Sequence, residues 1–316
     1  MRSEVFKKLL VPVDDSVSSL VAQELAALIA KEFESSVTVF YVVSHEFMNP
    51  EFVSLVGEVG VQEYAPSQIA RGEFSMPRLI PLPTGSAAQA SMISEVSNWY
   101  HQKGDEIVAE AVRLFKEEGI PVERKVIDHQ NPASAILREA DGGDYDAIVI
   151  GRSGEKDQEK QVRLGSTAGK VVRHAKIPVL VAAVKRNISK ILIPYDGSRG
   201  GDKALEYGSA LAKALKARGT LLYVQESGLF AAKPEVAKAI GERVLSKAGK
   251  MAKGVAFDQK IESGNVGKVI TETADKENFD IIIMGSKGRG GVQRFLMGSA
   301  SNHVLHYANH TVLLAK

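Results

Sequence analysis

The sequence predicts an α/β fold made of two doubly wound, five-stranded parallel sheets, each Rossmann-like and of the kind that binds nucleotides. Short apolar runs alternate with amphipathic helical stretches, which is typical of parallel strands buried on both faces. A length of 316 residues suits two domains. The sequence also repeats itself, so both halves are expected to share one fold.

The repeat is visible at two places in each copy. Residues 8–14 (KLLVPVD) match residues 190–196 (KILIPYD), and residues 146–151 (DAIVIG) match residues 280–285 (DIIIMG). The offset is 182 residues at the first match and 134 at the second, so the first copy contains 48 additional residues between them. We predict one domain at 1–187, with an insertion at about 44–105, and a second domain at 188–316.

Each copy is predicted to contain five strands and four helices. The strands are the short apolar runs, and the helices are the longer stretches whose apolar residues recur with a period of 3.6. In the first copy the strands are 9–13, 37–43, 122–127, 147–150 and 179–183, and the helices are 19–33, 105–118, 134–140 and 168–175. In the second copy the strands are 191–194, 220–224, 256–261, 281–284 and 312–315, and the helices are 203–216, 234–252, 266–276 and 299–308.

The insertion differs in composition from the rest of the chain. It contains five of the eleven prolines and the only tryptophan, Trp99. Because proline interrupts helices, residues 76–85 are predicted to form a loop. Three roles stay open for it: a lid over a site, a packing element, or a docking surface for a protein partner.

Composition excludes several classes of protein. The absence of cysteine rules out disulfides, thiol catalysis and cysteine-ligated metal sites. The longest apolar stretches are far shorter than the roughly 18 residues of a membrane span, and the N-terminus does not resemble a signal peptide. We therefore expect a cytoplasmic protein without membrane contact. A net charge of +2 gives no reason to expect nucleic acid.

A glycine-rich loop follows the fourth strand of the second copy. Gly285, Gly288 and Gly298 have the spacing G-x2-G-x9-G, and Ser299 opens the last helix. Glycines allow backbone amides to converge on an anion, and a helix N-terminus favours phosphate. A plain strand-to-helix turn with a serine N-cap is the alternative. Between residues 286 and 297 the loop has no acidic residue and three cations: Lys287, Arg289 and Arg294.

With Asp196 after the first strand, this spacing resembles the nucleotide-binding signature of universal stress proteins. The resemblance covers both copies apart from the insertion. It implies a tandem universal stress protein that regulates a stress response by binding ATP, ADP or AMP, with or without Mg²⁺, chiefly in its second domain. It also implies that the copies pair through their last strands, 179–183 and 312–315, and that chains form a homodimer. The residues implied to contact the nucleotide are Asp196, Val224, Gly264, Gly285, Gly288, Arg289, Gly298, Ser299 and Ser301.

The first copy departs from this pattern. Ten residues rather than nine separate Gly154 from Gly165, and Gln130 replaces the glycine found at Gly264. The first copy has a net charge of −5 and the second +7, and a triphosphate prefers the positive field. We therefore expect the first copy to bind weakly or not at all. Its weaker candidate residues are Asp14, Val42, Gly151, Gly154, Gly165 and Ser166.

Other constellations favour neither a metal site nor catalysis. Asp14-Asp15 resembles the acidic pair of receiver domains, but the phospho-acceptor aspartate is missing. The three histidines His303, His306 and His310 have no carboxylate or cysteine at ligand spacing, so no zinc site is predicted. No catalytic residue is predicted. Two other functions stay open: slow Mg-dependent ATP hydrolysis at the loop, and a nucleotide-independent stress scaffold that recruits a partner through the insertion.

Overall fold

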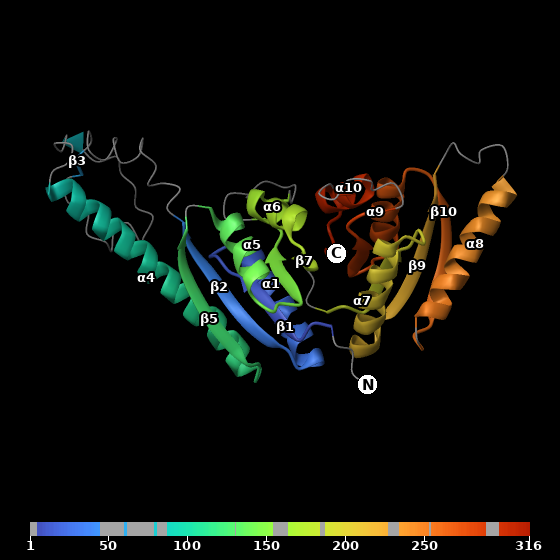
Figure 1. Cartoon of the computed structure of the whole chain (residues 1–316), viewed down its shortest axis with the longest axis horizontal. Helices are drawn as coiled ribbons and strands as arrows, with labels where there is room; N and C mark the ends of the chain where they lie inside the picture. The colour runs from blue at the N-terminus through green and yellow to red at the C-terminus, as the bar shows by residue number, and fades with distance from the viewer. Residues whose placement is uncertain are drawn as a thin grey trace.

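Ten strands form one continuous sheet in the computed structural model, which describes residues 5–44, 60–61, 79–80, 87–129, 131–153, 164–183, 187–226, 234–252, 254–288 and 297–316 (Figure 1). The strand order is β10-β9-β8-β11-β12-β7-β6-β1-β2-β5. The strands of the first half are β1 (Lys8–Pro12), β2 (Ser36–Ser44), β5 (Val122–His129), β6 (Ala147–Gly151) and β7 (Val179–Ala182). Those of the second half are β8 (Lys190–Pro194), β9 (Arg218–Gln225), β10 (Phe257–Ser263), β11 (Ile281–Gly285) and β12 (Thr311–Ala315).

The α/β fold predicted from the sequence is confirmed. Within each half the five strands are parallel and follow the doubly wound order 3-2-1-4-5. The halves join where β12 runs antiparallel to β7, with Leu313 opposite Leu180, so the predicted pairing through the last strands is also confirmed. The domain boundary between residues 187 and 188 stays a prediction.

Helices cover both faces of the sheet. One apolar cluster packs under α1, α4, α7 and α8, and the other packs under α5, α6, α9 and α10. Each cluster contains residues of both halves, so the core is continuous across the seam between β7 and β12. The first four of these helices are α1 (Val17–Phe33), α4 (Ala87–Glu117), α7 (Arg199–Leu215) and α8 (Pro234–Met251). The other four are α5 (Pro132–Gly142), α6 (Ser166–His174), α9 (Val266–Lys276) and α10 (Ser299–Tyr307).

The repeat extends to the helix ends. Ser16 caps α1 by accepting a hydrogen bond from the Ser19 amide, and Ser198 caps α7 by accepting one from the Gly201 amide. Both side chains satisfy an amide that the helix itself leaves unpaired. Asp14 and Asp196 lie two residues before these caps, and each accepts a hydrogen bond through Oδ1 from the amide of the capping serine, so they occupy equivalent positions in the two halves.

One predicted helix begins much earlier than expected. The helix expected at 105–118 begins at Ala87, so 18 residues assigned to the insertion belong to α4. Gly104 lies inside this helix, and a Cβ there would come within 2.5 Å of the Tyr41 ring, so only glycine allows α4 to pack this closely on β2. The remaining insertion lies outside the described residues, apart from a two-stranded pairing of β3 (Gly60–Val61) with β4 (Leu79–Ile80). The three alternatives for its role therefore stay open.

None of the described helices combines the length and the apolar character that would carry it across a bilayer.

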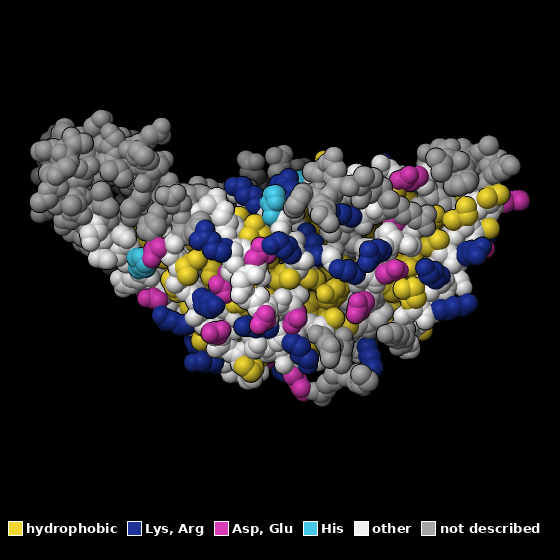
Figure 2. All heavy atoms as spheres, in the orientation of Figure 1, with side chains coloured by type: hydrophobic (Ala, Val, Ile, Leu, Met, Phe, Trp, Pro, Cys, Tyr) yellow, Lys and Arg dark blue, Asp and Glu magenta, His cyan; other side chains and the backbone are white. Residues whose placement is uncertain are grey.

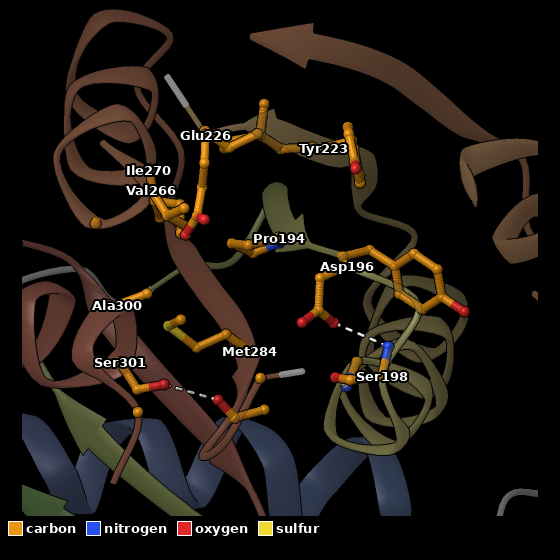
Figure 3. Close-up of a pocket in the computed structure, with 18 of the residues that line it drawn as sticks. Pro194, Asp196, Ser198, Tyr223, Glu226, Val266, Ile270, Met284, Ala300 and Ser301 are labelled. Atoms are coloured by element: carbon orange, nitrogen blue, oxygen red, sulfur yellow. Dashed lines mark hydrogen bonds between the residues drawn. The ribbon is translucent and has the colours of Figure 1, made fainter. Parts of the chain in front are cut away.

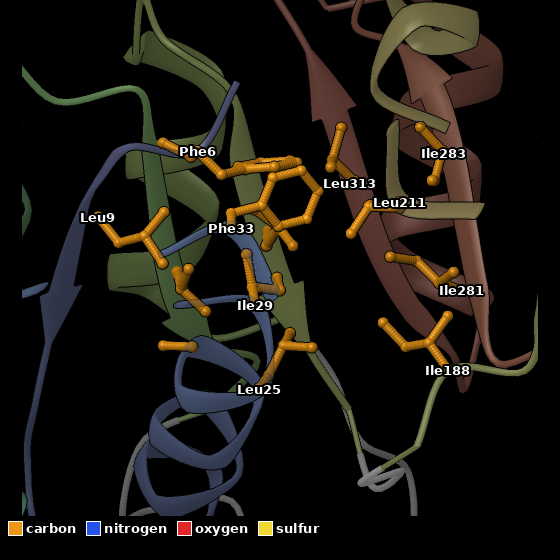
Figure 4. Packing of buried hydrophobic residues seen from close by; sticks show 14 of the residues in the cluster. Phe6, Leu9, Leu25, Ile29, Phe33, Ile188, Leu211, Ile281, Ile283 and Leu313 are labelled. Atoms are coloured by element: carbon orange, nitrogen blue, oxygen red, sulfur yellow. The ribbon is translucent and has the colours of Figure 1, made fainter. Parts of the chain in front are cut away.

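Aromatic packing joins the two halves beneath the sheet. The fully buried Phe6 packs edge-on against Phe33, with ring centroids 5.2 Å apart (Figure 4). It also packs against Tyr207 of α7, in the other half, at 5.3 Å. These contacts add to the strand pairing at the seam.

We predict that Phe6→Ala lowers the free energy of unfolding by about 3–5 kcal/mol, because it leaves a cavity between the halves. Urea unfolding of the full chain measures this. Val17→Ala is the matched control: Val17 is 78% exposed, and its truncation should change stability by less than about 0.5 kcal/mol. A loss below about 1 kcal/mol for Phe6→Ala would show that this contact does not stabilise the seam.

Candidate functional site

A cavity of about 970 Å³ opens at the carboxyl ends of β8, β9 and β11 in the second half (Figure 3). After β8 the chain passes into α7 on one face of the sheet, and after β11 it leads to α10 on the other. The cavity thus lies at the point where the strand order reverses, which is where doubly wound sheets bind ligands. The topology places the site in a crevice between two loops.

Two glycines allow the end of β11 and the first turn of α7 to approach each other closely. A Cβ on Gly285, at the end of β11, would lie 2.6 Å from the backbone carbon of Gly200 in the first turn of α7. A Cβ on Gly200 would lie 2.4 Å from the Lys287 carbonyl oxygen. Since real Cβ atoms do not approach backbone so closely, only glycine fits at these two positions without moving α7 away from β11. The glycine spacing of the sequence predicts Gly285, whereas nothing in that spacing points to Gly200.

The first turn of α10 forms one wall of the cavity. Gly298 is the N-cap of this helix, and no side chain caps its first amides. Ser299 is the first helical residue, so the alternative in which a serine caps the turn is wrong. The Gly298 amide donates to the Ser286 carbonyl at 2.9 Å, and the Ser301 hydroxyl donates to the Gly285 carbonyl at 2.9 Å (Figure 3). Uncapped amides at a helix N-terminus are suited to an anion.

Asp196 lies at the opposite wall, after β8. Its Oδ1 accepts a hydrogen bond from the Ser198 amide at 2.9 Å, which gives it the local turn role that is common for aspartate (Figure 3). A Cβ on Gly288 would lie 3.0 Å from Oδ2, so this oxygen faces the glycine-rich loop. One carboxylate therefore shapes the turn and borders the cavity.

The end of the cavity away from the glycine-rich loop is largely apolar. Val224 from β9 and Val266 and Ile270 from α9 line it, whereas Met284 from β11 lines the cavity near Ala300 and Ser301 (Figure 3). Glu226, which is exposed, follows β9 and points into the cavity above Val266 and Ile270 (Figure 3). An apolar slot with a few polar groups is typical of sites that bind a flat organic group.

Positive charge gathers near the loop. Lys287 lines the cavity. Burial, with a smaller contribution from the charge of Lys287, lowers the pKa of Lys316 to about 8. On the face shown in Figure 2, Lys and Arg side chains lie among Asp and Glu over both halves, so neither half presents a single sign of charge there. The charge of Lys287, rather than net charge, would attract an anion to this cavity.

Most of the residues predicted for the second half lie at this cavity. Gly264 is not among the lining residues: with φ 146° it forms the turn into α9, directly before Asn265, which does line the cavity. Arg289 lies outside the described residues. His303 lines the cavity, and the described residues contain no cluster of three or more His, Asp or Glu side chains suited to a metal. The predicted residues that line it are Asp196, Val224, Gly285, Gly288, Gly298, Ser299 and Ser301.

The equivalent crevice of the first half is built differently. Ser18 and Ser19 stand where the second half has Gly200 and Gly201. The Ser153 amide donates to the Ser18 hydroxyl at 3.0 Å, and the Asp14 amide donates to the Ser19 hydroxyl at 3.0 Å. Two backbone amides of this crevice therefore already donate hydrogen bonds to serine side chains of the protein. This exchange of serine for glycine is visible when the two copies of the sequence are compared.

The remaining first-half candidates follow the repeat. Gly151 ends β6, and a Cβ there would lie 2.6 Å from the Ser18 carbonyl oxygen. Val42 lies in β2, and Gly165 is the N-cap of α6, which begins at Ser166. Gly154 and Gln130 lie outside the described residues.

Fold and site together define a class: α/β proteins with a ligand cavity at the switch point of a doubly wound sheet. The model of the universal stress protein family matches residues 77–183 and 187–316. The chain belongs to this family and is a tandem member of it, as the sequence resemblance indicated.

Individual proteins to which the chain is similar are also universal stress proteins. A universal stress protein of Synechocystis is 25% identical over 313 residues, covering 97% of this chain and 99% of its own length. One of Methanocaldococcus jannaschii is 33% identical over 138 residues, covering 40% of this chain and 81% of its own. The crystal structure of a universal stress protein from Archaeoglobus fulgidus has the same fold, with a TM-score of 0.65, 22% identity and 98% of each chain covered.

We predict that Gly285→Ala lowers the free energy of unfolding by about 1–3 kcal/mol, because its methyl group displaces the start of α7. Denaturant unfolding and hydrogen exchange in the first turn of α7 measure the effect. Gly142→Ala is the control, since a Cβ at that helical position meets nothing within 4 Å. It should leave stability unchanged or raise it by up to about 1 kcal/mol. Equal behaviour of the two variants would contradict the close approach of β11 and α7.

Proposed function

We propose that this tandem universal stress protein is a regulatory stress-response protein that binds an adenine nucleotide in the cavity of its second half. The observation that carries the proposal is the junction, in one crevice, of an apolar slot with the uncapped N-terminus of α10 and a glycine-rich loop. A nucleotide needs both environments at once, because its base is flat and largely apolar and its phosphates are anionic. Membership of the family supports the choice of adenine.

The nucleotide would lie along the cavity, with its phosphates at the glycine-rich loop and its base in the apolar slot. The phosphates lie at Gly288, Gly298, Ser299 and Ser301, where backbone amides and the dipole of α10 favour negative charge. The base lies in the apolar slot beside Val224, and the ribose lies between them. The residues nearest the ribose are Asp196 and Gly285, with Gly264 supporting the turn beside the nucleoside and Arg289 contributing charge to the phosphates.

The two halves are proposed to bind unequally. In the first half the hydroxyls of Ser18 and Ser19 already accept hydrogen bonds from amides of the crevice. A nucleotide there would have to break these partly buried hydrogen bonds before it could use the same amides. The first-half residues Asp14, Val42, Gly151, Gly154, Gly165 and Ser166 are therefore assigned a weaker site or none.

The proposal assigns no catalytic residue and no protein ligand for Mg²⁺, which a bound nucleotide would carry on its phosphates. Binding would act by stabilising the occupied state. ATP at about 100 times its dissociation constant adds roughly 2.7 kcal/mol to the free energy of unfolding. Such a change can shift the choice of protein partner.

We predict that Gly298→Val weakens ATP binding at least about tenfold, because its side chain covers the first amides of α10. The fold should tolerate it, since a Cβ at Gly298 has no neighbour closer than 3.6 Å. Isothermal titration calorimetry of the full chain measures affinity and stoichiometry. Gly165→Val is the matched control: Gly165 is the N-cap of α6 with nearly the same φ and ψ, −61° and 158° against −64° and 149°.

The expected result is one strong site per chain, retained in Gly165→Val and lost in Gly298→Val. Two equal sites, or loss in Gly165→Val alone, would contradict the assignment to the second half. No binding or thermal shift with ATP, ADP or AMP would favour a nucleotide-independent scaffold. Phosphate release that disappears in Gly298→Val would favour a slow ATPase.

A further inference from the structure

The residue that follows β6 in the first half is an arginine, and its side chain reaches the seam between the two halves. Arg152 directly follows Gly151, at the position that Ser286 occupies after Gly285. Its side chain is 1% exposed, and its Nη2 donates a hydrogen bond to the Leu305 carbonyl oxygen at 2.6 Å. Leu305 belongs to α10, in the other half, so the contact joins residues 153 positions apart.

Leu305 lies in the last turn of α10, so Arg152 contacts the C-terminal end of this helix. The helix has nine residues, about 13 Å, and its last-turn carbonyls lack an amide partner within the helix. A cation there satisfies a carbonyl and offsets the negative end of the helix dipole. The opposite end of the same helix, at Ser299 and Ser301, lines the candidate nucleotide cavity. One short helix thus runs from the cavity to a first-half arginine.

Burying this arginine is costly. Desolvation lowers the pKa of the Arg152 guanidinium to about 10, so the group stays charged at neutral pH although it is removed from water. The Ser153 amide that follows it is bound to the Ser18 hydroxyl, which fixes the base of the loop. The hydrogen bonds of Arg152 and Ser153 together hold the guanidinium against α10.

The seam contains a second contact of this kind. Lys316, after β12, donates through Nζ to the Val172 carbonyl oxygen in α6 at 2.5 Å. Counted from Ser166 and Ser299, Val172 and Leu305 occupy equivalent positions in the last helix of their halves. Both helices thus receive a cation at the same carbonyl, but only α10 begins at the cavity in Figure 3.

We propose that Arg152 is a positioning residue for the nucleotide site of the second half, and that its side chain acts as a brace for α10. The inference rests on the proposed function. By holding the C-terminal turn of α10 and offsetting its negative end, Arg152 keeps the amides of the first turn oriented toward the phosphates. The affinity of the second half then depends on a residue of the first.

Three variants of the full chain test the brace by ATP titration. Arg152→Gln keeps an amide donor but removes the charge, and should weaken binding about three- to tenfold. Arg152→Lys keeps a charged donor and should bind within about twofold of wild type. The control is Lys176→Gln, which removes an exposed first-half cation that pairs with Asp141 and should not change affinity. Thermal unfolding of each variant separates affinity from stability.

Hydrogen exchange of the wild-type chain supplies a test without mutation. ATP should slow exchange at the first turn of α10 and also at the Arg152 and Ser153 amides of the first half. Protection confined to the second half, or equal ATP affinity in Arg152→Gln and wild type, would overturn the brace while leaving the proposed function intact. Failure of the wild type to bind ATP would overturn both.

Discussion

The antiparallel pairing of β12 with β7 is the constraint on which the other features depend. Each half ends on the strand that follows its last helix, so pairing these strands edge to edge makes one sheet of ten strands. The same pairing removes two exposed strand edges, which would otherwise be free to associate with other chains. It also extends both apolar clusters across the seam. The halves therefore share a core.

Repetition of the fold did not preserve equal crevices. In the second half, glycines at positions 200 and 285 let backbone approach backbone, and the amides of the glycine-rich loop and of α10 border a cavity. In the first half, serines stand at positions 18 and 19, and their hydroxyls bind amides within the protein. The serine side chains accept hydrogen bonds that glycine at the same positions could not accept. The two crevices therefore differ in their hydrogen bonding, and the proposed difference in nucleotide binding rests on this exchange.

Arg152, which directly follows β6 of the first half, also connects the two halves. Its side chain lies in the seam and contacts the helix that borders the cavity of the second half. Burial of a guanidinium disfavours folding unless hydrogen bonds and a complementary dipole offset the desolvation. The Leu305 carbonyl and the negative end of the α10 dipole supply part of that complement. The seam therefore carries polar contacts that orient the helices as well as the apolar contacts that hold the halves together.

The sequence by itself determined the repeat, the order of the elements and the position of the cavity. Apolar runs and glycine spacing are local patterns, and parallel strands buried on both faces have few other arrangements. Tertiary structure alone decided why Gly104 sits inside α4, why Gly200 must be glycine, and that Gly264 shapes a turn beside the cavity. It also decided that Arg152 reaches Leu305. These features depend on which backbone segments approach within van der Waals distance, and residues far apart in the chain meet only through packing.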